Sequence, residues 1–596
     1  MDAEVAGDYV GLTAIGRKPV TAEWIDSLCA AVDAGAMMRH LEEFAKRVKL
    51  SGTEEELESF RYLQATLTEY GYETDLILHD AYISLPGKAR VEIEAETPDC
   101  ITHSFSRSSP SGGLHGSVVY AGSGRPEDFA GVDVRGKIVL LDGMANPGAS
   151  RNASLAGAVG QIHISPHEHL HEMCVSPVWG SPTQATRDAL PSTVIVTLRK
   201  ADGDRLKRRV QGNAPVTATL HAAVDTGWRK TPILVAELPG PDKEEPFVMF
   251  SGHHDTWYYG VMDNGGANAT MLEIARLFAP ERTKWRRGLR LCFWSGHSHG
   301  RYAGSTWYAD THWHELVRRC VVHVNVDSTG AKGNTVLSDS PCSAELVGLA
   351  REAITVRGGQ EYDGHRMSRA GDQSFWGIGI PSMFMGMGEQ PAGSADSFTR
   401  SIFGGGTTRK GAGFGWWWHT PDDTLDKMDP DLLVRDTQIY VHTIGRLLTD
   451  SVLPLDYGAA AMTLRGELIR LQQALDNACD LSPLVARVDL LRERSQRVVG
   501  LTTIDDAAAA RVNKALMAVS RALVPMDYTT GDRFEHDPAL PQTLYPVLDV
   551  VRQLAAAPAG SDQVPFLTGG ARRACNRLGY ALDQAIDALS TCGETV

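Results

Sequence analysis

Hydrophobic residues recur at helical spacing in the first part of the chain. One set, with members three or four positions apart, consists of Phe60, Leu63, Leu67 and Tyr70. The segment from Thr53 to Glu56, just before this set, is a capping-box sequence, which is typical of the start of a helix. Gly71 follows the set and marks the end of the predicted helix. A strand is predicted at residues 74–78. The chain therefore opens as an α/β unit, which we assign to residues 1–85.

The pattern changes near Pro86, where short apolar runs begin to alternate with Gly, Pro and Ser. Residues 134–141 predict a buried strand, and residues 156–164 predict a turn that leads into another strand. This pattern of short strands and turns indicates a β-rich domain, inserted into the α/β fold over residues 86–230.

The α/β pattern resumes after the insert. The short apolar run 247–250 is consistent with a strand buried on both faces, and residues 267–278 predict a helix with an apolar stripe. Two further strands are predicted at 289–294 and 320–326. Such alternation of strands and helices is expected of a largely parallel sheet, so residues 231–455 form the second part of the α/β domain.

Beyond Asp456 the chain is rich in leucine and alanine. Apolar residues at helical spacing there include Leu464, Leu468, Leu471 and Leu475. We therefore predict a separate helical domain over residues 456–596. The expected fold is α/β, with a mixed sheet flanked by helices, a β-rich insert and a C-terminal helical domain. A chain of 596 residues is too long for one core and divides into roughly three or four domains.

Composition and net charge indicate which kinds of binding partner and which cellular location to expect. A hydrophobic content of 43% with 22% charged residues is ordinary for a soluble globular protein. The formal net charge of −15 argues against nucleic acid or an anionic membrane as a partner, because both need a basic face. No apolar run approaches the length of a membrane span, and the first residues show no signal peptide. The nine cysteines are scattered without a Cys-x-x-Cys pair, which favours reduced thiols and a cytoplasmic location.

Polar residues that bind metal ions follow three of the predicted strands. His253 and Asp255 come after the strand 247–250, and Asp327 follows the strand that ends at Val326. His297, Ser298 and His299 follow the strand 289–294, and Asp263 precedes the next helix. A further histidine, His419, lies in a loop before a helix that we expect to begin at Pro421. Because open α/β sheets bind ligands beyond the carboxyl ends of their strands, these side chains predict one metal site.

These segments resemble the metal-site motifs of the zinc aminopeptidase family that includes glutamate carboxypeptidase II and the transferrin receptor. The resemblance implies that four residues are metal ligands, namely His253, Asp263, Asp327 and His419. It implies that Asp263 bridges two ions and that Asp255 holds the ring of His253 by a hydrogen bond. The insert resembles the protease-associated domain of the family, and the helical tail resembles its dimerisation domain, which implies a homodimer.

The family carries two adjacent glutamates where this chain has His297 and Ser298. In the family the first glutamate is the general base and the second is a metal ligand. A serine hydroxyl is a poor zinc ligand, so Ser298 does not replace that carboxylate. Imidazole can either bind a metal or take a proton near neutral pH, so both roles are open to His297. We expect His297 to be the catalytic base, with His299 assisting it or binding the metal. If the segment is extended, His297 and His299 lie on one face.

Three interpretations follow. His297 or His299 becomes a ligand, or only the ion bound through His253, Asp263 and Asp327 remains, or the site is inactive as in the transferrin-receptor branch. The ligands favour zinc, and histidine in place of carboxylate also admits iron, manganese or cobalt. Our leading hypothesis is a metal-dependent hydrolase of an amide or other C–N bond in a small, aromatic substrate. The alternatives are a metal-dependent lyase and a non-catalytic receptor-like or scaffold protein.

Three further residues are candidates for contact with the substrate. Arg301 and Arg369 could bind a carboxylate, because guanidinium grips one through two hydrogen bonds. Asp372 lies where the resembling family has a pocket loop, and it could face an amine.

Overall fold

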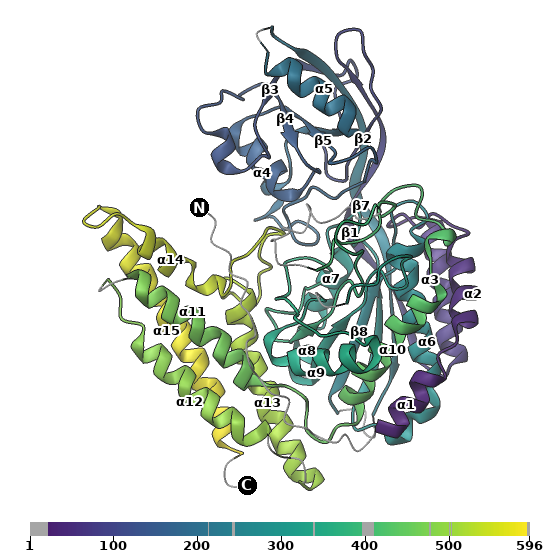
Figure 1. Cartoon of the computed structure of the whole chain (residues 1–596), viewed down its shortest axis with the longest axis vertical. Coiled ribbons are helices and arrows are strands. Elements are labelled where there is room, and N and C mark those ends of the chain that lie inside the picture. The colour runs from purple at the N-terminus through teal and green to yellow at the C-terminus, as the bar shows by residue number, and fades with distance from the viewer. Residues whose placement is uncertain are drawn as a thin grey trace.

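The protein is described by a computed structural model, which covers residues 22–212, 214–240, 245–337, 340–395, 410–475, 478–499, 501 and 504–592. Figure 1 shows an α/β part with a central sheet, a β-rich part above it and an array of long helices at the left. The expected α/β fold with a mixed sheet and a C-terminal helical region is confirmed.

The central sheet carries the strands whose ends build the candidate site. Its parallel strands are β11 (Ser382–Met383), β10 (Cys320–Asn325), β8 (Phe247–His253) and β9 (Gly288–Trp294), in that order. The long strand β7 (Thr217–Leu238) pairs antiparallel with β9. Every residue of β8, β9 and β10 is buried, as expected for strands covered by helices on both faces.

Alternate residues of β8 enter two different hydrophobic cores, because successive side chains of a strand point to opposite faces. Val248 and Phe250 pack in the core that includes residues of α6 (Ala267–Phe278) and α10 (Pro430–Thr449). Phe247 and Met249 lie in a second core. That core takes residues from α7 (Ala303–Thr311) and α8 (Trp313–Arg319). The sheet is thus fixed between two layers.

Two long strands join the α/β part to the β-rich part. β1 (Glu73–Glu92) pairs antiparallel with β7 along almost its whole length, with a register shift between Pro86 and Ala89. The predicted strand 74–78 is only the beginning of β1. The β-rich part adds β2 (Cys100–Thr102), β3 (Leu114–Tyr120), β4 (Ile138–Asp142), β5 (Gly160–Ile164) and β6 (Val194–Leu198), with helices α4 (Pro147–Ala156) and α5 (Lys200–Val210).

The remaining helices flank the sheet or form the C-terminal region. Before the insert lie α1 (Ala22–Ala30), α2 (Ala34–Phe44) and α3 (Glu54–Glu69), and α9 (Val347–Ala353) follows β10. The side chain of Thr53 caps α3, as its sequence predicts. The C-terminal region consists of α11 (Tyr457–Leu475), α12 (Ser482–Val499), α13 (Asp506–Tyr528), α14 (Asp549–Ala556) and α15 (Gln563–Ser590). In the described parts of the chain, no helix has the length and apolar character to span a membrane.

The helix expected from Pro421 does not form there. Residues 421–424 make a turn, and α10 begins at Pro430, capped by the side chain of Asp429. The carboxylate of Asp423 instead accepts hydrogen bonds from the backbone N–H groups of Met262 and Asp263. The segment after His419 therefore ties two loops of the candidate site together.

Candidate metal centre

The candidate ligands meet at one edge of the central sheet. His253 is the last residue of β8, and Asp327 lies two residues beyond the end of β10. Asp263 lies in the helical turn Val261–Gly266 that precedes α6, and His297 lies in the loop that follows β9. Parallel strands bring their carboxyl ends to the same edge, which places these side chains together.

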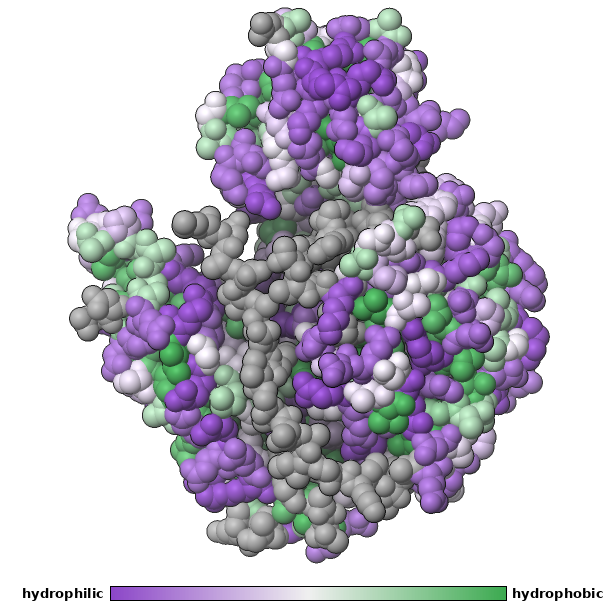
Figure 2. All heavy atoms as spheres, viewed as in Figure 1, coloured by the Kyte–Doolittle hydropathy of each residue, from purple (hydrophilic) through white to green (hydrophobic). Residues whose placement is uncertain are grey.

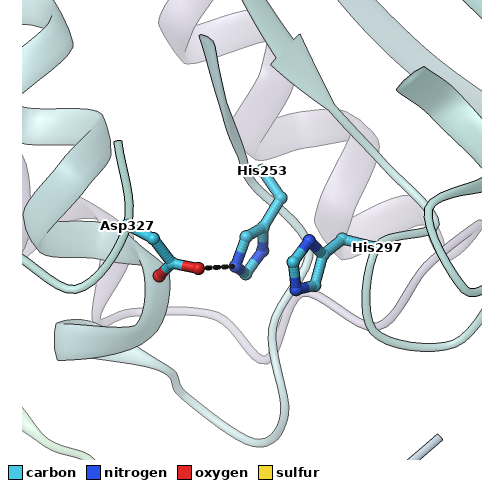
Figure 3. Close-up of side chains that lie close together, drawn as sticks. All are labelled: His253, His297 and Asp327. Atoms are coloured by element: carbon cyan, nitrogen blue, oxygen red, sulfur yellow. Dashed lines mark ion pairs between the residues drawn. The ribbon is translucent and has the colours of Figure 1, made fainter. Parts of the chain in front are cut away.

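His253 faces two carboxylates. Its Nε2 atom lies 3.1 Å from Oδ1 of Asp263 and 3.7 Å from Oδ2 of Asp327. Figure 3 shows Asp327 on one side of the His253 ring and His297 on the other. Among the described residues, neither His253 Nε2 nor Asp263 Oδ1 has a hydrogen-bond partner of acceptable geometry, although both are buried. Bonds of about 2.0–2.1 Å to one tetrahedral ion leave ligand atoms roughly 3.4 Å apart, so each carboxylate lies at about the distance from His253 that a shared ion requires.

The second oxygen of Asp263 faces another imidazole. Asp263 Oδ2 lies 3.1 Å from Nε2 of His419. The two oxygens of one carboxylate therefore face two different histidines, which is the arrangement of a carboxylate that bridges two ions. The resemblance places Ser298 at the second metal position. Its buried hydroxyl has no hydrogen-bond partner among the described residues, and a serine hydroxyl is a poor zinc ligand.

Three histidines of the site are fixed through Nδ1. The Nδ1 atom of His253 lies 2.8 Å from the backbone oxygen of Asp255, and that of His419 lies 2.7 Å from the backbone oxygen of Glu172. The Nδ1 atom of His297 lies 2.6 Å from Oδ2 of Asp372. Since a carbonyl or carboxylate oxygen only accepts, each Nδ1 carries the proton and each neutral ring keeps its Nε2 lone pair for a ligand or a proton.

The side chain of Asp255 contacts other groups than the His253 ring that we expected it to hold. We expected its side chain to hold the ring of His253, but the backbone carbonyl of Asp255 does so. The carboxylate instead accepts hydrogen bonds from the backbone of His297 and Ser298, at 3.2 and 2.9 Å, and from Ser51 Oγ at 2.6 Å. Asp255 therefore fixes the loop that carries His297.

Burial and the neighbouring charges shift the pKa values of His253 and Asp263 in opposite directions. Burial lowers the pKa of His253, but its contacts with Asp263 and Asp327 outweigh this and hold the pKa well above its usual range. Burial raises the pKa of Asp263, but His253 and His419 hold it below its usual range. The buried carboxylate of Asp263 and the part-buried carboxylate of Asp327 are thus stabilised by positive charge at the point they face, which a divalent ion can supply.

His297 is stacked on His253. The ring centroids are 3.7 Å apart and the planes differ by 14°. Ligand atoms of His253, His297 and Asp327 all lie within 4.8 Å of one another, so these three residues form a cluster that could hold a metal ion. In a nearly parallel stack, however, the two lone pairs lie in separate planes. An ion about 2.1 Å from Nε2 of one ring therefore does not lie along the lone pair of the other.

His299 lies apart from His297. We expected the two to share a face if their segment were extended, but residues 295–302 form bends and turns. His299 is fully buried, its Nδ1 lies 2.9 Å from Ser51 Oγ, and burial lowers its pKa to about 4. Its ring packs against Trp257 at 4.4 Å between centroids. These contacts place His299 behind the site, which does not favour the catalytic role we expected for it.

Backbone strain is concentrated around the site. Six non-glycine residues beside it have positive φ angles: Tyr258, Arg301, Tyr302, Ser328, Asp372 and His419. Such conformations cost on the order of 1–3 kcal/mol each, and they persist where surrounding contacts enforce them. Asp372 and His419 are thus held in place by their partners rather than by local preference.

Arg301 and Arg369 are engaged by the protein itself. Arg301 is directed at the backbone oxygens of Cys174 and Ser176. Arg369 donates to the backbone oxygen of Asp537 and stacks on Trp179 at 3.9 Å. Neither guanidinium is available to a substrate carboxylate in this arrangement. Asp372, which we expected to face an amine, faces His297 instead.

Comparisons with known proteins agree with this geometry. Residues 234–444 match the family model described as Peptidase family M28. The probable glutamate carboxypeptidase VP8 of Zea mays is 23% identical over 595 residues, which covers 81% of this chain and 77% of the maize protein. The probable glutamate carboxypeptidase AMP1 of Arabidopsis thaliana is 22% identical over 597 residues, covering 83% and 81%.

Two solved structures share the fold of a large part of the chain. An aminopeptidase from Aneurinibacillus sp. strain AM-1 has a TM-score of 0.54 at 22% identity, over 71% of this chain and 96% of its own. A zinc aminopeptidase from Bacillus subtilis has a TM-score of 0.54 at 18% identity, over 70% and 96%. Over residues 234–444, the α/β part of this chain is therefore similar to peptidase family M28.

Proposed function

We propose that this protein is a metal-dependent hydrolase that cleaves an amide or other C–N bond in a small, aromatic substrate and is not a standard peptidase. One observation carries the proposal. The carboxylates of Asp263 and Asp327 that face His253 adjoin a His297–Asp372 pair, and His297 with Ser298 stands where the resembling family has two adjacent glutamates.

The residues that would hold the ion are His253, Asp263 and Asp327, and His419 on the second oxygen of Asp263 would hold another. A bound divalent ion polarises the substrate carbonyl and lowers the pKa of a water molecule. Zinc is the leading candidate, because imidazole and carboxylate suit it and because the B. subtilis relative is named as a zinc enzyme. Iron, manganese and cobalt accept the same donors.

His297 is the proposed general base. Its Nδ1–H is held by Asp372, so Nε2 carries the lone pair that takes a proton from the attacking water. Burial raises the pKa of Asp372, but His297 outweighs this and lowers it, which keeps Asp372 ionised. The ionised carboxylate orients the imidazole and stabilises the cation that forms when Nε2 is protonated, so that the proton can pass to the leaving nitrogen.

Aromatic side chains surround His419 and support an aromatic substrate. Trp418 stacks on His419 at 3.4 Å between ring centroids, and Trp257 lies 5.2 Å from the same ring. Tyr258 is part-exposed and donates to the carboxylate of Glu172 at 3.0 Å. Aromatic lining with a few fixed polar groups is common in small-molecule pockets.

The exchange of carboxylates for His297 and Ser298 argues against ordinary peptidase activity. A positioned general base contributes about 10²–10⁴-fold in rate, and a second ion that lacks its carboxylate is held less well. We therefore expect weak turnover of simple peptides.

The experiment is elemental analysis of protein purified without chelator, followed by assays on two substrate panels. One panel contains dipeptides and tripeptides, and the other contains N-acyl and carbamoyl derivatives of aromatic amines. Stoichiometric transition metal with turnover confined to the second panel supports the proposal. Protein without metal, or peptide turnover at the rates of dedicated peptidases, contradicts it.

A further inference from the structure

A segment of the β-rich part runs along the candidate site. It consists of residues 171–181, between β5 and β6, and is called the strap below. The strap contacts the loop that carries His419 at one end and the loop that carries Asp372 at the other. Most of its residues are buried.

At the first end, the backbone of the strap pairs with His419 in both directions. The N–H of Glu172 donates to the backbone oxygen of His419 at 3.1 Å, and Nδ1 of His419 donates to the backbone oxygen of Glu172 at 2.7 Å. One residue earlier, Nδ1 of His171 contacts the backbone oxygen of Trp418. His171 is 2% exposed, so water does not substitute for this contact.

At the other end, the strap reaches the partner of His297 through hydroxyl groups. Trp179 Nε1 donates to Ser374 Oγ at 2.9 Å, and Ser374 Oγ lies 2.9 Å from Ser305 Oγ. Ser305 Oγ in turn donates to Oδ1 of Asp372 at 2.8 Å. The network is buried, and a buried network whose members are all bonded rigidifies the groups it joins.

The α/β part anchors the middle of the strap. Arg301 is directed at the backbone oxygens of Cys174 and Ser176, and the N–H of Gly180 donates to the backbone oxygen of Arg301 at 2.7 Å. These bonds fix the strap against the loop that follows β9. The strap is therefore held independently of the histidines that it contacts.

His419 needs such support. It has a φ angle of 58°, a conformation that a non-glycine residue adopts only when other contacts enforce it. The residues around it form turns rather than a helix or strand. The bonds from the strap are thus the contacts that orient its Nε2 toward Asp263, 3.1 Å away.

We infer that the strap positions His419 for metal binding and that His171 is the side chain that fixes this end of the strap to the ligand loop. The β-rich insert is then part of the metal site, and His171 is a positioning residue that acts through Trp418 and His419. The inference rests on the proposed function only in requiring that the site binds a metal ion. Partners that orient a ligating histidine typically contribute 10–100-fold to metal affinity.

The test is Zn²⁺ titration of the full chain against a chromophoric chelator, with Co²⁺ absorption spectra as a second measurement. His171→Phe removes the donor and keeps an aromatic ring, whereas His171→Asn keeps an N–H near the position of Nδ1. His115→Phe is the matched control, because His115 is an exposed histidine of the same insert. His419→Ala identifies the binding event that depends on His419, and circular dichroism confirms that each variant is folded.

We expect His171→Phe to weaken the His419-dependent event about 10–100-fold, with His171→Asn and His115→Phe close to wild type. The same affinity in His171→Phe and wild type overturns the inference. So does zinc binding that His419→Ala leaves unchanged, and the proposed function then stands on the ion held by His253, Asp263 and Asp327. Should His171→Phe fail to fold, His171→Leu takes its place, because it removes the same N–H donor, and an affinity equal to that of the wild type then overturns the inference. Wild-type protein that binds no metal overturns the proposed function itself.

Discussion

The imidazole of His297 and the carboxylate of Asp372 lie 2.6 Å apart, from Nδ1 to Oδ2, although 75 residues separate them in the chain. The carboxylate fixes the tautomer of the ring and leaves Nε2 free on the side of the candidate ligands. Because His297 also stacks on His253, its lone pair is placed beside the metal-binding atoms rather than among them. The geometry of the pair therefore favours a role for His297 as a base rather than as a metal ligand. Mutation separates the two roles, because loss of a base leaves the metal bound and loss of a ligand releases it.

We expect His297→Ala to retain its metal and to lose activity by about 10²–10⁴-fold, because it removes a general base and no ligand. Asp372→Asn should lower the rate while also leaving the metal content unchanged, since the amide does not stabilise the charged imidazole. Elemental analysis and initial rates on the best substrate of the aromatic panel check both. Loss of metal in His297→Ala, with His314→Ala unaffected, would identify His297 as a ligand instead.

The second prediction concerns the ligands. His253→Ala or Asp327→Ala should reduce bound transition metal far below one equivalent, because each removes a donor from a small set. Treatment of the wild type with chelator should lower its melting temperature, since the carboxylates of the buried Asp263 and the part-buried Asp327 then lose the ion that neutralises them. Elemental analysis and thermal denaturation measure these effects. His314→Ala is the control, because His314 is exposed and outside the site. Unchanged metal in both ligand variants would place the ion elsewhere.

A pH dependence of stability follows from Glu345. This side chain is 4% exposed, and burial raises its pKa from 4.5 to about 7. The folded protein therefore holds this proton more tightly than the unfolded chain does. The resulting stabilisation is complete below pH 4.5 and is lost as the pH rises through 7. The free energy of unfolding falls by about 3 kcal/mol across this pH range as a result.

Glu345→Gln should accordingly raise the melting temperature at pH 8 and leave it nearly unchanged at pH 5, because the amide carries no charge to bury. Thermal denaturation at the two pH values measures the effect. Glu55→Gln, at an exposed position of α3, is the matched control. Equal shifts at pH 5 and pH 8 would show that Glu345 does not titrate in this range.

The sequence predicts the parts of this structure that depend on local patterns. The strands that end near residues 253, 294 and 325 are visible as apolar runs, and the candidate ligands follow them directly. The helix expected at Pro421 was wrong, because Asp423 bonds to the backbone of Met262 and Asp263, far away in the sequence. No local pattern reports such a contact.

The partners of the site histidines were missed for the same reason. Glu172 meets His419 across 247 residues, and Asp372 meets His297 across 75. The loop after β9 was expected to be extended, but Gly296, Arg301 and Tyr302 adopt positive φ angles and turn it. His297 and His299 then point to different partners. Tertiary contacts, rather than local preference, decide these conformations.

The last prediction concerns assembly. Figure 2 shows hydrophobic residues interspersed on the described surface of the helical region. On α15, Phe566 is 84% exposed and Tyr580 is 67% exposed, and about four turns of helix place them on the same side. Burying both rings against a second copy would remove a large apolar area from water, and two-fold dimers are the commonest oligomers. We therefore expect a homodimer through the helical region.

Light scattering of the wild type at micromolar concentration should give twice the mass of one chain. The double variant Phe566→Glu with Tyr580→Glu should give the mass of one chain. Phe534→Glu, at an exposed phenylalanine outside α15, is the control. Wild-type protein with the mass of one chain contradicts the prediction.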